Sequence, residues 1–98
     1  VRNWLHAEDH VAAIDLVLRQ GRSGHAYNVG ADHERENLEV VQAILDRVGK
    51  PRSLVRHVED RPGHDRRYGL DTTLIREELG WRETRDWQQT MNDTVDWT

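Results

Sequence analysis

The stretch from residue 60 to residue 68 holds the densest set of side chains that could bind a ligand. It reads Asp60-Arg61-Pro62-Gly63-His64-Asp65-Arg66-Arg67-Tyr68. Guanidinium groups bind phosphate oxygens through paired, charge-assisted hydrogen bonds, and Pro62 and Gly63 favour a turn that lets the side chains converge. The same residues could also form a solvated loop whose arginines pair with nearby acids. Residue types alone leave both interpretations open.

Outside this stretch, two residues are candidates for the same kind of chemistry. Arg2 lies in an apolar and aromatic stretch and could supply another phosphate ligand, although a charge at a strand edge is ordinary. Asn37 precedes an apolar-periodic segment, where helix N-capping explains an asparagine fully. His6 and His10 have the spacing of metal ligands on a helix, but the predicted change from strand to helix falls between them. We expect no metal site.

Two catalytic patterns are missing. A Gly-x-Gly-x-x-Gly fingerprint needs glycines at tight spacing after a strand, and the nearest approach, Gly21 and Gly24, follows a predicted helix. A short-chain dehydrogenase also needs a tyrosine four residues before a lysine, because the lysine lowers the pKa of the phenol for proton transfer. The only lysine is Lys50, and position 46 is Asp46. The chain therefore encodes no dinucleotide site, and we predict no catalytic residue in it.

The composition suits one small domain that normally packs on something else. The 98 residues are 36% hydrophobic and 33% charged, with no Phe, which is lean for an independent core. The net charge of -4 argues against a nucleic-acid partner. There is no Cys, and the apolar runs are too short to cross a membrane. The chain starts at Val1 without a signal peptide, and we expect a cytoplasmic piece cut from a longer protein.

The elements that must position these residues alternate between strands and helices. Short apolar segments predict strands at residues 1–7, 26–29 and 54–58. Helical spacing predicts helices at residues 8–20, 38–48 and 72–79, and a last one that starts at Thr84 or Asp86. We expect the first helix to be buried on more than one side, Asn37 and Asp71 to act as caps, and Trp81 to pack into the body. The predicted class is α/β or mixed α+β, with polar loops at residues 30–36 and 59–68.

Several segments of the chain carry known motifs. They are Arg2-Asn3-Trp4-Leu5-His6 with Glu8-Asp9-His10, Tyr27-Asn28-Val29-Gly30, Glu36-Asn37-Leu38-Glu39-Val40-Val41, Leu79-Gly80-Trp81, Thr94-Val95-Asp96-Trp97 and, without a change, the run from Asp60 to Tyr68. Together they resemble the dTDP-glucose 4,6-dehydratases, which are extended short-chain dehydrogenase/reductases. The resemblance covers essentially the whole chain, and the nine-residue loop is its most specific part.

The resemblance implies an enzyme that converts dTDP-glucose to dTDP-4-keto-6-deoxyglucose with a tightly held NAD. This chain would be its C-terminal substrate-binding region, inactive alone. The Rossmann domain, the NAD site and the catalytic residues would lie upstream, and the complete enzyme would be a homodimer. The resemblance assigns substrate contacts to Arg2, Asn37, His64, Asp65, Arg66, Arg67 and Tyr68.

Two positions depart from the family pattern. Asn3 replaces an aspartate that could orient Arg2, and Ala31-Asp32 replaces the second glycine after the predicted strand at residues 26–29. An alanine tolerates positive φ less well than glycine, so the turn there could differ. Two other functions stay open: the C-terminal part of another nucleotide-sugar epimerase or decarboxylase, and a non-catalytic module that binds a nucleotide sugar or a protein.

Overall fold

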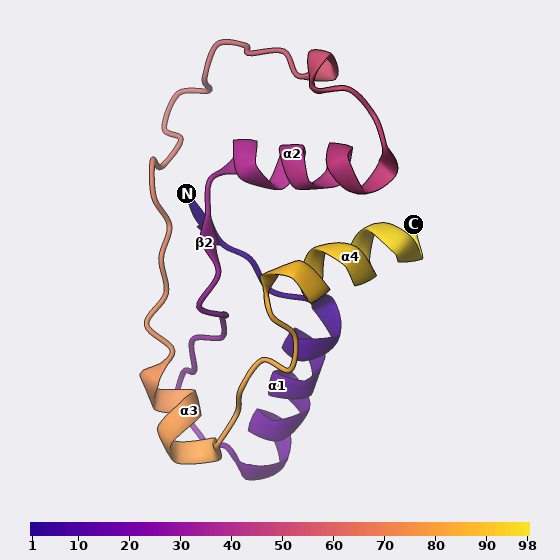
Figure 1. Cartoon of the computed structure of the whole chain (residues 1–98). Helices are drawn as coiled ribbons and strands as arrows, with labels where there is room; N and C mark the ends of the chain where they lie inside the picture. The colour runs from indigo at the N-terminus through magenta and orange to yellow at the C-terminus, as the bar shows by residue number, and fades with distance from the viewer.

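The computed structural model describes residues 1–98 and contains helices and strands in the predicted mixed α/β class (Figure 1). Its elements are β1 (Arg2–Asn3), α1 (Ala7–Gln20), β2 (Glu34–Arg35), α2 (Asn37–Val48), the 3-10 turn η1 (Arg52–Leu54), α3 (Thr73–Leu79) and α4 (Trp87–Trp97). The two strands pair antiparallel, with Arg2 opposite Arg35 and Asn3 opposite Glu34.

Helix α1 begins with a side-chain cap and buries one narrow stripe. The His6 Nδ1 accepts a hydrogen bond from the Glu8 amide at 3.0 Å, which satisfies one of the free N–H groups of the first turn. Ala13 is fully buried. The prediction that α1 is buried on more than one side is wrong within this chain, because Val11, Ile14 and Leu18 are 63%, 55% and 82% exposed. Nothing in these 98 residues covers that second apolar stripe.

Helix α2 follows β2 almost directly, and this spacing corrects the predicted cap. Glu36 is the N-cap residue and makes no side-chain capping bond, while Asn37 is already the first residue of the helix. Because β2 ends at Arg35, the chain turns into the helix one residue earlier than the sequence pattern indicated. Gly49 ends the helix in the left-handed region, with φ 72°, as expected for a glycine at this position.

The two C-terminal helices lie where they were predicted, with one correction. Thr72 is the N-cap residue of α3 and makes no side-chain capping bond, so the helix begins one residue later than predicted and Asp71 lies just before the cap. The Asp71 carboxylate still accepts from the Thr73 amide at 3.0 Å, and Gly80 closes the helix. Asp86 is the N-cap residue of α4. Its side chain accepts from the Gln89 amide, while the Gln89 side chain accepts from the Asp86 amide. This reciprocal pair is a capping box. Between the helices, Trp81 is 4% exposed, as predicted.

The strand predictions are largely wrong. Only Arg2 and Asn3 of residues 1–7 form a strand, and residues 26–29 and 54–58 form none. The actual partner strand, β2, lies in the segment predicted to be a polar loop. A strand requires a neighbour for its backbone groups, and the apolar segment at 26–29 has no such neighbour in this chain. Tyr27 and Val29 instead pack against the core.

The core is small and the molecule is thin. Ala13, Ile75 and Trp81 form the central buried cluster. The radius of gyration is 15.9 Å, against roughly 13 Å for a compact chain of about 100 residues. In Figure 1 the chain after η1 runs down one edge of the molecule to α3 and passes beside the N-terminus. None of the helices has both the length and the apolar character needed to cross a membrane.

Candidate functional site

The arginine-rich loop is fastened to β1. The Tyr68 amide donates to the Val1 carbonyl at 2.7 Å, and the Val1 nitrogen donates to the Arg66 carbonyl at 2.6 Å. Tyr68 also forms a parallel bridge with Arg2. We call β1, β2 and residues 60–69 together the arginine edge. Its backbone bonds join parts of the chain more than sixty residues apart.

The Arg2 side chain contacts the backbone and the tyrosine of the 60–69 loop, and these contacts fix both the arginine and the loop. The Arg2 Nη1 donates to the carbonyl oxygens of Val1 at 2.9 Å and Asp65 at 3.1 Å. The Arg2 Cζ lies 5.6 Å from the centroid of the Tyr68 ring, within the range of a cation–π contact. The Tyr68 side chain remains largely exposed. Arg2 therefore orders the loop and leaves the Tyr68 ring open to solvent.

The Arg67 side chain is held by an ion pair to β2. Its Nη1 lies 2.5 Å from the Glu34 Oε2, an ion pair between β2 and the loop. A Cβ added to Gly69 would lie 2.6 Å from the Glu34 Oε1, so the carboxylate lies directly against the backbone of Gly69. The two side chains are 62% and 43% exposed, and the Arg67 guanidinium is accessible to a ligand.

His64 contacts an acid of its own loop. Its Nδ1 lies 2.6 Å from the Asp60 Oδ1. This hydrogen bond is the main reason why the pKa of Asp60 lies below its usual value, and a bond from the Arg61 amide adds to the effect. Gly63 sits between them with φ 77°, a conformation that favours glycine. The turn therefore folds His64 back onto Asp60.

The remaining three sequence-predicted residues make no side-chain bonds, and Asp65 contributes only its carbonyl, which accepts from Arg2. Arg66 contributes only its carbonyl to the fastening of the loop, and its side chain is exposed. Asn37 is exposed at the start of α2, two residues beyond Arg35. The structure thus brings Arg2, Asp65, Arg66, Arg67 and Tyr68 to one edge. It gives no direct contact between that edge and Asn37, and none between the Arg2 and Arg67 guanidinium groups.

Sequence reasoning missed Glu34 and Arg35. Arg35 lies opposite Arg2 in the strand pair, with its Cζ 5.0 Å from the centroid of the Trp87 ring. Its carbonyl accepts a hydrogen bond from the Trp4 Nε1 at 3.2 Å. The polar run that contains both residues predicted a loop, and only the pairing with β1 would have placed them at the site.

The two departures from the family pattern contact each other. The Asn3 Oδ1 accepts from the Ala31 amide at 2.8 Å. No hydrogen bond joins Asn3 to Arg2. In this structure the residue at position 3 therefore does not orient Arg2, contrary to the expectation for the aspartate that it replaces. No residue other than glycine has a positive φ, and Ala31 therefore fits its turn without strain. A Cβ on Gly30 would lie 2.8 Å from the Asn3 Oδ1, so the bond also depends on this glycine.

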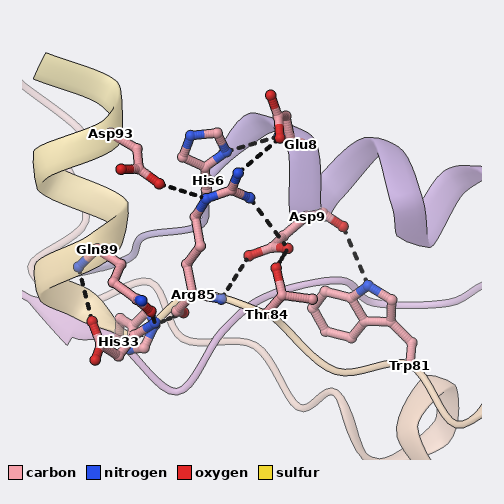
Figure 2. A network of polar contacts seen from close by, with 10 residues as sticks. His6, Glu8, Asp9, His33, Trp81, Thr84, Arg85, Gln89 and Asp93 are labelled. Atoms are coloured by element: carbon pink, nitrogen blue, oxygen red, sulfur yellow. Dashed lines mark hydrogen bonds and ion pairs between the residues drawn. The ribbon is translucent and has the colours of Figure 1, made fainter. Parts of the chain in front are cut away.

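A second polar network braces the fold (Figure 2). Asp9 is 3% exposed, and its carboxylate accepts from the Thr84 Oγ1 at 2.6 Å and the Arg85 amide at 3.3 Å. Burial by itself raises the pKa of Asp9, but the bonds from Thr84 and Arg85 together with the Arg85 charge lower it below its usual value. The Arg85 guanidinium also pairs with Glu8 at 2.8 Å and Asp93 at 2.9 Å.

This network links α1, the segment before α4, and α4 itself. An open depression beside it is lined by His6, Glu8, Arg85, Asp93 and Trp97, among others. A smaller apolar cavity of about 190 Å³ lies between α2, α4 and the segment that follows β1, which contributes Trp4 and Leu5. No residue of the 60–69 loop lines either hollow. The His6 side chain is used as a cap, and no group of three potential metal ligands is present.

The fold defines the class of protein as the C-terminal portion of a 4,6-dehydratase. The sequence profile of the GDP-mannose 4,6 dehydratase family matches residues 1–94, and the chain belongs to this family. Among curated relatives, a dTDP-glucose 4,6-dehydratase of Xanthomonas campestris pv. campestris is 50% identical over 99% of this chain and 30% of its own length. One from Streptomyces niveus is 49% identical over 98% of this chain and 29% of its own length. These relatives confirm the resemblance to dTDP-glucose 4,6-dehydratases.

Two solved structures agree with this assignment. The dTDP-glucose 4,6-dehydratase of Bacillus anthracis in complex with NAD superimposes with a TM-score of 0.89 and 40% identity, over 97% of this chain and 30% of that one. The enzyme from Streptomyces venezuelae with NAD and TYD bound has a TM-score of 0.90 and 42% identity, with the same coverage. The chain therefore spans about 30% of the length of its relatives and aligns with their C-terminal portion.

Proposed function

We propose that this chain is the nucleotide-binding part of a dTDP-glucose 4,6-dehydratase, a lyase that forms dTDP-4-keto-6-deoxyglucose. The chain contains neither the Tyr-Lys dyad nor a dinucleotide fingerprint, so it does not catalyse the reaction alone. The identity of about 50% to proteins of that name supports the dTDP-linked substrate.

The observation that carries this proposal is the fastening of the loop to β1. It places the backbone of Arg66, Arg67 and Tyr68 beside β1, and Arg2 makes no direct ion pair with the loop acids. We assign substrate contacts to Arg2, Asn37, His64, Asp65, Arg66, Arg67 and Tyr68. The Arg66 and Arg67 guanidinium groups would hold the diphosphate through paired hydrogen bonds. The exposed Tyr68 would supply a hydroxyl group or a stacking face.

Binding at this edge would act on the reaction from a distance. The nucleotide is remote from the hexose carbons that react, and energy from remote contacts can orient the reacting part of a substrate. The arginine edge would therefore hold the nucleotide while the rest of the enzyme supplies the reacting groups. Its residues need no pKa tuned for proton transfer.

The residues of this chain do not fit NAD. Gly21 ends α1 and Gly24 lies in the following turn, and the only strand pair is antiparallel. A dinucleotide site needs a glycine-rich turn between a parallel strand and a helix. We therefore place NAD on the preceding Rossmann domain of the complete enzyme. The NAD-bound relatives from B. anthracis and S. venezuelae support this placement.

The apolar stripe on α1 would pack on that remaining domain. Val11, Ile14 and Leu18 are more than half exposed and follow helical spacing, which is the pattern of a buried face. The relatives are about three times longer than this chain, which covers 30% of their length. We further propose a cytoplasmic homodimer whose subunit contact lies mainly outside these 98 residues, as the family resemblance implies.

Replacing Arg67 tests the proposed function. In the complete enzyme, Arg67→Ala should raise the KM for dTDP-glucose roughly tenfold or more, because hydrogen bonds to a charged group are lost. Steady-state kinetics would measure it. Arg52→Ala is the matched control, since that arginine is equally exposed (61% against 62%) and also pairs with one acid. An unchanged KM in Arg67→Ala would contradict the proposal, and tighter binding of GDP than of dTDP would contradict the assigned nucleotide.

A further inference from the structure

Glu34 is the only acid that pairs with an arginine of the 60–69 loop. It comes from β2, 33 residues away along the chain. Its backbone position is well fixed, because Glu34 lies opposite Asn3 in the strand pair and the Trp4 amide donates to the neighbouring His33 carbonyl at 3.1 Å. A carboxylate on such a strand offers Arg67 a defined anchor, whereas the loop alone offers it none.

Gly69 leaves the space that this carboxylate occupies. An added Cβ would come within 2.6 Å of the Glu34 Oε1, closer than real Cβ contacts. The φ of Gly69 is not in the left-handed region, so the backbone itself does not require glycine there. A side chain at position 69 would therefore displace the end of the Glu34 side chain from its place beside Arg67.

We propose that Glu34 is a positioning residue for Arg67, an inference that rests on the proposed function of the arginine edge. A guanidinium has five N–H donors in a planar fork. Glu34 contacts Nη1 of Arg67, which leaves the donors on Nε and Nη2 for a phosphate group. The anchored side chain then loses less conformational freedom when the diphosphate binds, and less lost freedom means higher affinity.

The negative charge of Glu34 has an opposite effect, since it repels a diphosphate. Both side chains are about half exposed, so solvent screens this repulsion. Anchoring should therefore exceed repulsion. The two effects can be separated because a glutamine keeps the oxygen that accepts from Arg67 and removes the charge, whereas an alanine removes both.

The experiment measures the Kd of dTDP by calorimetry in the complete enzyme and its variants. Glu34→Ala should weaken binding roughly two- to fivefold, the range for an exposed ion pair. Glu34→Gln should bind as well as the parent enzyme or better. Gly69→Ala should weaken binding to a similar extent by displacing the carboxylate. In the Glu34→Ala background Gly69→Ala should have no further effect, because the two changes remove the same contact.

Two controls separate positioning from a general loss of structure. Asp96→Ala breaks a comparably exposed ion pair with Arg47, which lies in the last turn of α2 and so at the far end of that helix from β2, and it should leave the Kd unchanged. The melting temperature of Glu34→Ala should also stay close to that of the parent enzyme, because the lost ion pair is exposed. If Glu34→Ala binds dTDP as tightly as the parent enzyme or more tightly, Glu34 does not position Arg67. The proposed function of the arginine edge is then still tested by Arg67→Ala. If Arg67→Ala itself binds dTDP normally, both proposals fail.

Discussion

Asp9 is a carboxylate that the surrounding chain keeps charged although it is almost fully buried. It accepts hydrogen bonds from the Thr84 hydroxyl and the Arg85 amide, and the indole of Trp81 donates to its carbonyl at 3.2 Å. A buried charge is tolerated only when it is paired and hydrogen-bonded. Asp9 thereby joins the start of α1 to the segment that leads into α4 (Figure 2).

Acidic pH should weaken this connection between α1 and the segment that leads into α4. The pKa of Asp9 is lower in the folded state than its ordinary value of 3.8. Its stabilising contribution is therefore complete above that ordinary value and is lost as the pH falls through the lower folded pKa. We expect Asp9→Asn to lower the free energy of unfolding by about 1–3 kcal/mol near neutral pH and to flatten its decline below about pH 4. Denaturant titrations of the complete enzyme would measure both. Asp15→Asn, an exposed control on α1, should change neither.

The sequence indicated part of the chemistry at this scale. The loop at residues 60–68 stood out because arginine, histidine and tyrosine are concentrated there. Glu34 did not stand out, because its contact with Arg67 depends on strand pairing across 33 residues. Asn3 was expected to concern Arg2, yet it bonds to Ala31. Residue type predicts what a side chain can bind, and the fold decides which partner it reaches.

Among the elements, α4 depends most clearly on its N-cap residue, Asp86. Asp86 and Gln89 satisfy each other's backbone amides, and the helix carries Asp93 and Asp96, which pair with arginines outside it. Loss of the cap would loosen the turn that aligns these acids. An exposed ion pair from Asp96 to Arg47, with contacts of 2.9 and 2.5 Å, adds to the packing of α4 on α2.

We expect Asp86→Ala to cost about 1 kcal/mol of stability, the usual effect of removing an N-cap side chain. Thermal melting of the complete enzyme would report the loss. Gln88→Ala is the control, because Gln88 lies in the same helix and is exposed, and bonds only to Asn92. An equal fall in melting temperature for both variants would show that the capping box has no special role.

Helices were predictable here and strands were not, for a physical reason. A helix satisfies its backbone within its own segment, so Gly49, Gly80 and Asp86 could mark its ends from sequence alone. A strand needs a partner elsewhere. The segments at residues 26–29 and 54–58 have strand-like composition but no partner in this chain, and β2 has polar composition and a partner.

At the scale of the whole molecule, the apolar surface exceeds what the fold covers. The buried hydrophobic residues number six, whereas large exposed hydrophobic residues occur on every helix. A long dimension of 48 Å against a short one of 18 Å adds to the surface that must be covered. Such a chain is marginal by itself, because burial of apolar surface is the main favourable contribution to folding.

The isolated 98 residues should therefore melt broadly and bind a hydrophobic dye, as loosely packed states do. In the complete enzyme we expect Ile14→Glu to lower stability by about 2 kcal/mol or more, because a charge would enter a buried contact. The same change should have little effect on the isolated chain, where Ile14 is 55% exposed. Calorimetric melting of both forms measures this, with Arg19→Glu as a control. A sharp cooperative transition of the isolated chain would instead favour an independent binding module.

The fastening of the loop to β1 also determines the order in which the molecule can assemble. The bond from the Tyr68 amide to the Val1 carbonyl closes a ring that contains α1 and α2, and closing a ring of that length costs about 3–4 kcal/mol of chain entropy. Helices form from local contacts and need no such closure, so they precede it. We therefore expect the arginine edge to be among the last parts to become ordered during folding. Weakening the Arg2 or Tyr68 contacts should then hasten unfolding more than it slows refolding.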